Sequence, residues 1–125
     1  MPHPSEHRSA TQPLNDGEAD ELAETLRALG SPGRLRLLME LVDGEQTVEH
    51  LALASHLSPS ATSHNLRILR SLRLVTPRRV GRHVVYALHD HHIADLLAAI
   101  RHHHEHVNPS ADVPPWKAAR PAERA

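Results

Sequence analysis

The chain of 125 residues contains no cysteine. Disulfide bonds, thiol catalysis and thiolate metal sites are therefore excluded, including sites that detect soft metals through sulfur ligands. Long apolar stretches are also missing, since the longest run of consecutive apolar residues has five members. A membrane-spanning helix needs about 20 such residues, and no charged-then-apolar leader opens the chain. We therefore expect a cytoplasmic protein without a membrane partner.

Acidic side chains are missing from residues 51–88, although the whole chain has a formal net charge of −1. The stretch contains six arginines instead: Arg67, Arg70, Arg73, Arg78, Arg79 and Arg82. A local block of one sign matters more for contact with phosphate than the sum over the chain. We therefore expect this region to face nucleic acid.

Proline divides the chain into a folded middle and two tails, because seven of the ten prolines lie in residues 1–16 and 108–125. Neither end has apolar periodicity, so we predict a disordered N-terminal tail at 1–16 and a disordered C-terminal tail at 108–125. Residues 17–107 form the predicted DNA-binding and dimerisation domain. Its size allows only a modest core, which dimerisation would help to complete.

Capping residues followed by proline mark the starts of two predicted helices. Ser31 and Pro32 begin a helix that extends to about residue 42, and Ser58 and Pro59 begin another at 59–72. The apolar residues expected to point inward from the first of these are Leu35, Leu38 and Met39. An earlier helix at 18–29, which ends at Gly30, has one apolar face formed by Leu22, Leu26 and Leu29.

A helix-turn-helix is predicted around the second cap. Thr47 can cap a short helix that ends only a few residues before the helix at 59–72 begins, and two helices joined so tightly form this motif. Leu66, Leu69 and Leu72, with Ile68, form the predicted buried face of the second helix. Its other face is formed by Ser60, Ser63, His64 and Arg67. Such a face suits a DNA major groove, whereas a merely solvated helix would favour Glu and Lys.

Residues 74–88 change to a β pattern, with β-branched runs on either side of a glycine turn. The hairpin predicts a wing, from which Arg79 and Arg82 would contact the flanking backbone or the minor groove. The alternative, a hairpin that only packs on the core, leaves the arginine cluster unexplained. The predicted fold is mostly α with a β-hairpin wing: a winged helix-turn-helix, dimeric through its terminal helices. We expect no enzyme, because Ser63 and His64 are adjacent rather than poised for catalysis.

Residues 88–107 hold seven of the thirteen histidines within a helical apolar pattern. Ile93, Leu96, Leu97 and Ile100 form one stripe, and histidines extend it at both ends. Asp90 and His92 cluster at the start, and His103 and His106 at the end. His102 and His104 should point away from the stripe and be solvated. The alternative for the whole histidine-rich stretch is a solvated face with adventitious metal affinity.

The two clusters lie too far apart for one chain to close them around one ion. Eleven residues of helix separate His92 from His103, which is about 16 Å. Two copies of the helix packed antiparallel would bring Asp90 and His92 of one protomer beside His103 and His106 of the other. Imidazoles and a carboxylate suit Zn(II), Ni(II) or Co(II). His3 is a candidate extra ligand.

These segments together resemble the ArsR/SmtB family of metal-responsive winged-helix repressors. The likeness covers roughly residues 18–107. Three features carry the likeness. Two are the segments LRALGSPGRLRLL and SPSATSHNLRILRSLRLVTPRRVGRHVVYAL. The third is a D-x-H pattern followed by an H-x-x-H pattern, in which the first histidine of the second comes eleven positions after the histidine of the first. The third helix begins Thr47, Val48, Glu49, His50, where thiolate sensors of the family keep a cysteine pair, so that site is absent.

The resemblance implies a homodimer that binds operator double-stranded DNA without metal and is released when Ni(II), Co(II) or Zn(II) binds. Histidine at position 106, where some zinc sensors place Glu, favours nickel or cobalt. Two alternatives stay open. In one, a winged-helix regulator, repressor or activator, is not controlled by the histidines. In the other, the chain is a histidine-rich metal-buffering protein with several weak sites and no operator.

Overall fold

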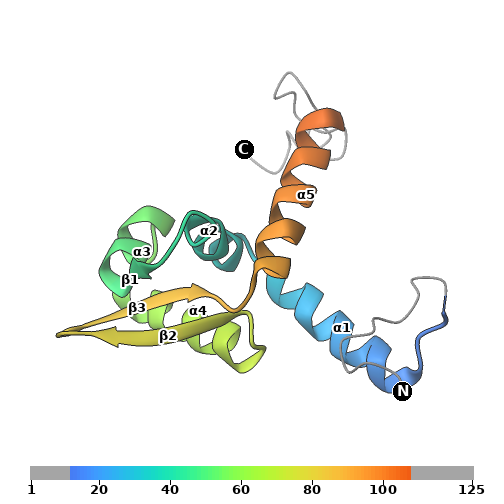
Figure 1. Ribbon diagram of the computed structural model, residues 1–125, viewed down its shortest axis with the longest axis horizontal. Helices are drawn as coiled ribbons and strands as arrows, with labels where there is room; N and C mark the ends of the chain where they lie inside the picture. The colour runs from blue at the N-terminus through green and yellow to red at the C-terminus, as the bar shows by residue number, and fades with distance from the viewer. Residues whose placement is uncertain (1–11, 108–125) are drawn as a thin grey trace, which may run out of the picture.

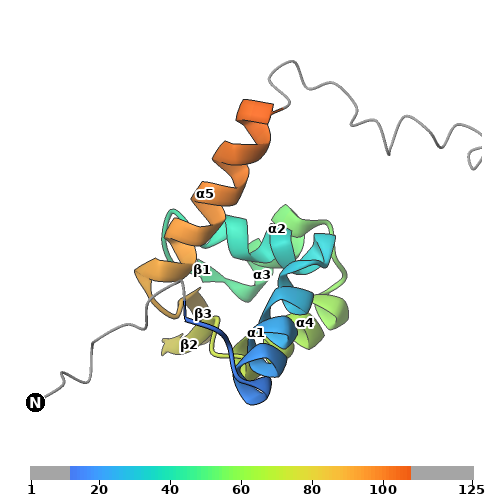
Figure 2. The same ribbon diagram turned by 90° about the vertical axis from the view of Figure 1, so that its right-hand side faces the viewer.

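The computed structural model describes residues 12–107, which form helices around a small sheet (Figure 1). The elements in chain order are α1 (Asp16–Leu29), α2 (Pro32–Glu40), β1 (Gln46–Thr47), α3 (Val48–Ser55), α4 (Pro59–Ser71), β2 (Val75–Val80), β3 (His83–Leu88) and α5 (His91–Val107). Figures 1 and 2 show α1 and α5 projecting from a body made of the other elements. The predictions for residues 1–11 and 108–125, including His3, lie outside the described residues.

Side-chain caps start the helices where the sequence predicts them. The side chains of Ser31, Thr47 and Ser58 each accept a hydrogen bond from the backbone N–H three residues later. Helix α1 begins two residues earlier than predicted, because Asn15 and Glu18 form a reciprocal capping box. Helix α2 ends at Glu40, somewhat before the predicted end near residue 42.

The core lies where α2, α3 and α4 pack together and where the start of α5 meets the sheet. Its fully buried large side chains are Leu37, Leu38, Leu51, Leu66, Leu69 and Leu97. Burial of Leu37 was not predicted, whereas Leu35 and Met39 are only partly buried at the edge of the core. On α4, Thr62 joins Leu66 and Leu69 on the buried face, and Ile68 and Leu72 are half-buried.

The predicted hairpin is confirmed, with Val80 opposite His83 and Gly81 at a φ of 60° in the two-residue loop. Such a loop requires positive φ at its first position, which glycine adopts without strain. Strand β1 pairs with the other edge of β3, giving the order β1-β3-β2. Strand β2 is therefore an edge strand, where Pro77 is tolerated. Within residues 12–107, every helix is too short or too polar to cross a membrane.

Candidate DNA-contact surface and candidate metal ligands

Helix α4 presents the predicted polar face to solvent. Ser60, Ser63, His64 and Arg67 are all exposed, while Thr62, Leu66 and Leu69 are buried on the opposite side. Only three residues separate α3, which ends at Ser55, from α4, which begins at Pro59. The arrangement leaves a strip of hydroxyl, imidazole and guanidinium groups free to meet an external ligand.

A recess of about 250 Å³ extends this strip toward the sheet. It is lined by Val48, Ser63, Leu66, Arg67, Arg70 and Tyr86. Arg70 was not assigned to the DNA-contact set, although it lies three residues after Arg67 and seven after Ser63. That spacing puts all three on one helix face, so the sequence already contained the signal.

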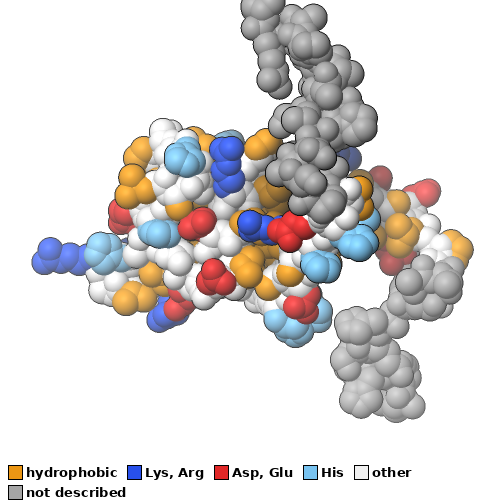
Figure 3. Space-filling model, turned by 90° about the horizontal axis from the view of Figure 1, so that it is seen from above, with side chains coloured by type: hydrophobic (Ala, Val, Ile, Leu, Met, Phe, Trp, Pro, Cys, Tyr) orange, Lys and Arg blue, Asp and Glu red, His pale blue; other side chains and the backbone are white. Residues whose placement is uncertain are grey.

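The wing carries three arginines that differ in their surroundings. Arg78 forms an ion pair with Glu45, and the hydrogen bonds from Arg78 lower the pKa of the Glu45 carboxyl despite some desolvation. Arg79 and Arg82 are exposed, and neither forms an ion pair with any of residues 12–107 in the structure. Basic side chains project beyond the tip of the hairpin at the left edge of Figure 3. Arg79 and Arg82 are thus exposed, as contact with DNA would require, and that contact stays a prediction.

The first pair of candidate metal ligands lies at the start of α5. Oδ1 of Asp90 accepts hydrogen bonds from the backbone N–H of His92, at 3.0 Å, and of Ile93, at 3.3 Å. Nδ1 of His92 lies 3.4 Å from the same oxygen. Partial desolvation alone would raise the pKa of the Asp90 carboxyl, but the Ile93 amide and the His92 imidazole and amide outweigh it and lower that pKa.

The second pair, His103 and His106, lies in the last turns of α5 and is exposed. The four candidate ligands therefore form two pairs at opposite ends of one helix. Among the described residues, no three His, Asp or Glu side chains of this chain are close enough to hold an ion together. A site that uses all four residues needs a second copy of α5.

The apolar stripe of α5 divides into two flanks. Ile93 and Leu97 pack on the core with 9% and 0% exposure, whereas Leu96 and Ile100 are 42% and 47% exposed. His92, Leu96, Ile100 and His103 follow one another at spacings of four, four and three residues, so they share the exposed flank. Both candidate pairs therefore border an apolar surface that residues 12–107 of this chain leave exposed.

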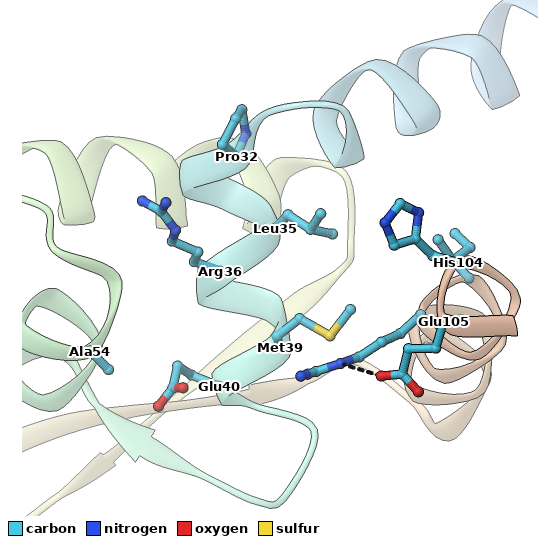
Figure 4. Close-up of a pocket in the computed structure, with 10 residues that line it drawn as sticks. Pro32, Leu35, Arg36, Met39, Glu40, Ala54, His104 and Glu105 are labelled. Atoms are coloured by element: carbon cyan, nitrogen blue, oxygen red, sulfur yellow. Dashed lines mark ion pairs between the residues drawn. The ribbon is translucent and has the colours of Figure 1, made fainter. Parts of the chain in front are cut away.

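A groove of about 610 Å³ separates α2 from the C-terminal half of α5 (Figure 4). In that view, His104 and Glu105 of α5 face Leu35 and Met39 of α2. The prediction that His104 points away from the apolar stripe is therefore wrong, since His104 lines the groove together with Ile100. Ile100 and His104 are four residues apart, so they lie on the same face of the helix.

Sequence comparisons agree with these features. Residues 31–76 match the family profile described as bacterial regulatory protein, arsR family. The chain is 43% identical over 109 residues to the HTH-type transcriptional regulator NmtR of Mycobacterium tuberculosis, covering 86% of this chain and 91% of that protein. It is 49% identical over 86 residues to a transcriptional repressor SmtB homologue of Synechocystis, covering 69% and 65%.

Solved structures show the same architecture. The solution structure of apo-NmtR matches with a TM-score of 0.66 and 40% identity, over 91% of this chain and 95% of that one. A homodimeric winged helix-turn-helix DNA-binding domain from Mycobacterium bovis matches with a TM-score of 0.68 and 31% identity, over 85% and 100%. The winged helix-turn-helix fold predicted from the sequence is confirmed.

Proposed function

This chain belongs to the arsR family of bacterial regulatory proteins, and on that premise we propose that it is a homodimeric transcriptional repressor released from operator DNA by a metal ion. The relatives named above include a transcriptional regulator and a transcriptional repressor. The observation that carries the metal-responsive part is the presence of a candidate ligand pair, Asp90 with His92 and His103 with His106, at each end of the exposed flank of α5.

The DNA-binding part is supported by the exposed face of α4 and by the wing. Ser60 and Ser63 offer hydroxyl groups, and Arg67 with His64 offers donors that reach base edges or phosphates. Arg79 and Arg82 extend the basic surface beyond the body of the molecule. All of these groups lie within residues 51–88, which contain no acidic side chain although the net charge of the chain is −1.

The homodimer is supported by apolar side chains left exposed on the two projecting helices. Leu22 and Leu26 on α1 are 50% and 59% exposed, and Leu96 and Ile100 on α5 are exposed to a similar degree. Large apolar side chains left exposed along helices that project from the body are typical of a surface that another chain covers. The Mycobacterium bovis relative is itself homodimeric.

The donor set fits a borderline transition metal. Asp90 has a lowered pKa and is therefore ionised at neutral pH, and the His92 and Asp90 side chains are 65% and 42% exposed, within reach of another chain. Asp90 and His92 of one protomer with His103 and His106 of its mate would hold Ni(II), Co(II) or Zn(II), and His3 stays a candidate extra ligand. The ion would supply a cross-link between the two α5 helices.

The test combines DNA binding with metal addition. A duplex selected from a random pool by the metal-free protein is labelled, and its affinity is measured by fluorescence anisotropy with and without Ni(II), Co(II) and Zn(II). We expect at least one ion to weaken binding by roughly 5- to 150-fold, the range of typical allosteric coupling.

The matched variants are His103→Ala and His102→Ala, which remove neighbouring imidazoles from different faces of α5. His103→Ala should abolish the metal effect, and His102→Ala should keep it. If neither variant changes the metal effect, the histidine pairs do not form the regulatory site. If no duplex is enriched by the selection, the chain is no operator-binding protein.

A further inference from the structure

A single side chain, Arg34 in the first turn of α2, joins the end of α1 to the middle of α4. Its Nε donates a hydrogen bond to the carbonyl oxygen of Ala28, at 3.0 Å, and its Nη1 donates to Oδ1 of Asn65, at 3.1 Å. Both contacts are partly buried. Helix α1 carries part of the proposed dimer surface and α4 the proposed DNA-contact face, so this guanidinium lies between the two.

The partners of Arg34 are themselves held in place. Nδ2 of Asn65 donates to the carbonyl oxygen of Ala61 one turn earlier on α4, at 3.0 Å, which leaves the amide oxygen of Asn65 turned toward Arg34. Ala28 is 4% exposed at the end of α1. The backbone N–H of Arg34 donates to the capping hydroxyl of Ser31, at 3.4 Å, so the start of α2 is fixed as well.

A guanidinium group is planar and points its N–H bonds in fixed directions. Two bonds from one such group therefore define the direction as well as the distance between the groups that accept them. A lysine ammonium has the same charge, but it is a point donor on a flexible stem and sets no such angle. The identity of this residue thus matters for the orientation of α4 relative to α1.

We infer that Arg34 is a positioning residue for operator recognition: it sets the angle of α4 against the dimerisation helix α1, and hence the relation between the two α4 helices of a dimer. The inference rests on the proposed function. Operator binding requires the two recognition helices to meet successive major grooves at one spacing. Contact with random DNA requires only positive charge near phosphates. Loss of the Arg34 link should therefore reduce the preference for operator DNA more than the affinity for DNA in general.

The first test compares Arg34→Lys with Arg36→Lys in the full-length protein. Both variants keep the charge, and Arg36 is an exposed arginine on the same helix that forms no hydrogen bond to α1 or α4 in the described structure. The readout is the ratio of affinities for the selected operator duplex and for a scrambled duplex, with metal affinity measured separately without DNA. Arg34→Lys should lower the ratio about tenfold, the loss expected for one charged hydrogen bond, and should leave metal affinity unchanged.

The second test approaches the same link from α4. Asn65→Asp keeps the oxygen acceptor for Arg34, whereas Asn65→Leu removes it at similar volume. The negative charge added in Asn65→Asp weakens binding to the operator duplex and to the scrambled duplex alike, so the ratio of the two affinities should stay near the wild-type value. In Asn65→Leu that ratio should fall. This pair remains informative if thermal unfolding shows that Arg34→Lys does not fold.

The following outcomes would overturn the inference. Equal ratios in Arg34→Lys and wild type would do so, as would equal ratios in Asn65→Asp and Asn65→Leu. A matching loss for operator and scrambled DNA would assign Arg34 to general stability instead. A wild-type protein that prefers no duplex would overturn the proposed function, and this inference with it.

Discussion

The guanidinium of Arg78 on β2 donates two hydrogen bonds to the carboxylate of Glu45, the first from Nε to Oε2 at 2.9 Å. Glu45 directly precedes β1, 33 positions earlier in the chain, so the pair ties the far edge strand to the loop before the sheet. The charge of Arg78 is thereby balanced on the wing, while Arg79 and Arg82 form no ion pair in the described part of the chain. Three arginines that look alike in the sequence therefore differ in their availability to DNA.

Replacement of Glu45 by Gln should release Arg78 and strengthen binding to DNA of any sequence. Each additional phosphate contact steepens the dependence of log K on log salt concentration by about 0.9. We expect Glu45→Gln to show a slope steeper by about that amount, measured by anisotropy titrations at several salt concentrations. Glu49→Gln is the matched control, because Glu49 faces His83 at 3.5 Å rather than an arginine. An equal change in both variants would mean that only net charge matters.

The same ion pair should contribute to stability in a pH-dependent way. The pKa of Glu45 is lower in the folded chain than in the unfolded one, so the contribution is present above the unfolded pKa, which is about 4.3 for Glu. It is lost as pH falls through the folded pKa. The difference in unfolding temperature between wild type and Glu45→Gln should therefore shrink as pH falls below about 4.3 and disappear once pH is below the folded pKa. A difference that does not shrink as pH falls below that value would show that Gln disturbs the structure in another way.

Asp90 has one observed role, as a helix cap, and one proposed role, as a metal ligand, and substitution can separate them. Its carboxylate caps α5 through the backbone N–H groups of His92 and Ile93, and it is a candidate metal ligand. Asn is as good a cap as Asp but carries no charge. Asp90→Asn should therefore keep the unfolding temperature of the metal-free protein but lower the metal affinity. Asp90→Ala should lower both the unfolding temperature and the metal affinity. Calorimetric titration with Co(II) and thermal unfolding measure the two effects. Wild-type metal affinity in Asp90→Asn would remove Asp90 from the ligand set.

Local features of the fold were predictable from the sequence because they depend on neighbouring residues. The caps formed by Ser31, Thr47 and Ser58 need only a hydroxyl and the backbone N–H three residues later. The hairpin likewise needed only a glycine between β-branched runs. Strand β1 was missed because two residues have no detectable period, and its pairing with β3 is a tertiary contact.

Contacts between distant positions were not predictable in the same way. Arg34 and Asn65 are 31 residues apart, and no pattern marks them as partners. Helical spacing placed Leu96 and Leu97 in the same stripe, but packing on the core decides that Leu97 is buried and Leu96 exposed. For the candidate metal site, the nearness of Asp90 and His92 follows from local spacing. Its completion by His103 and His106 depends on a second chain, so it stays a prediction.

The exposed flank of α5 should be essential for dimerisation. In the dimer, a carboxylate at position 96 would be buried in the interface without a partner, which costs about 3 kcal/mol or more. We therefore expect Leu96→Glu to weaken the dimer by on the order of a hundredfold, measured by sedimentation across a concentration series. Leu53→Glu is the control, since Leu53 is 80% exposed on α3, away from the projecting helices. A dimer that both variants leave intact would place the interface elsewhere.

Two hydroxyl groups are buried in the helix-turn-helix, and removing one should stabilise the fold while removing the other should destabilise it. Oγ of Ser55 has no hydrogen-bond partner in the described structure, whereas Oγ1 of Thr62 donates to the carbonyl oxygen of Ser58 at 2.9 Å. Both residues are 0% exposed. A buried polar group without a partner carries a desolvation cost that is not offset. Ser55→Ala should therefore raise the free energy of unfolding by about 1 kcal/mol, which corresponds to roughly 4–8 °C in Tm for a domain of this size.

Thr62→Val keeps the shape of its side chain and removes a hydrogen bond that is made, so we expect it to lower the free energy of unfolding by about 1 kcal/mol. Chemical denaturation of the two variants and wild type at equal protein concentration gives both values. Destabilisation by Ser55→Ala of the same size as by Thr62→Val would show that the Ser55 hydroxyl is hydrogen-bonded in solution, for example to a buried water molecule. In that case, the tight turn between α3 and α4 would depend on that bond as well as on apolar packing.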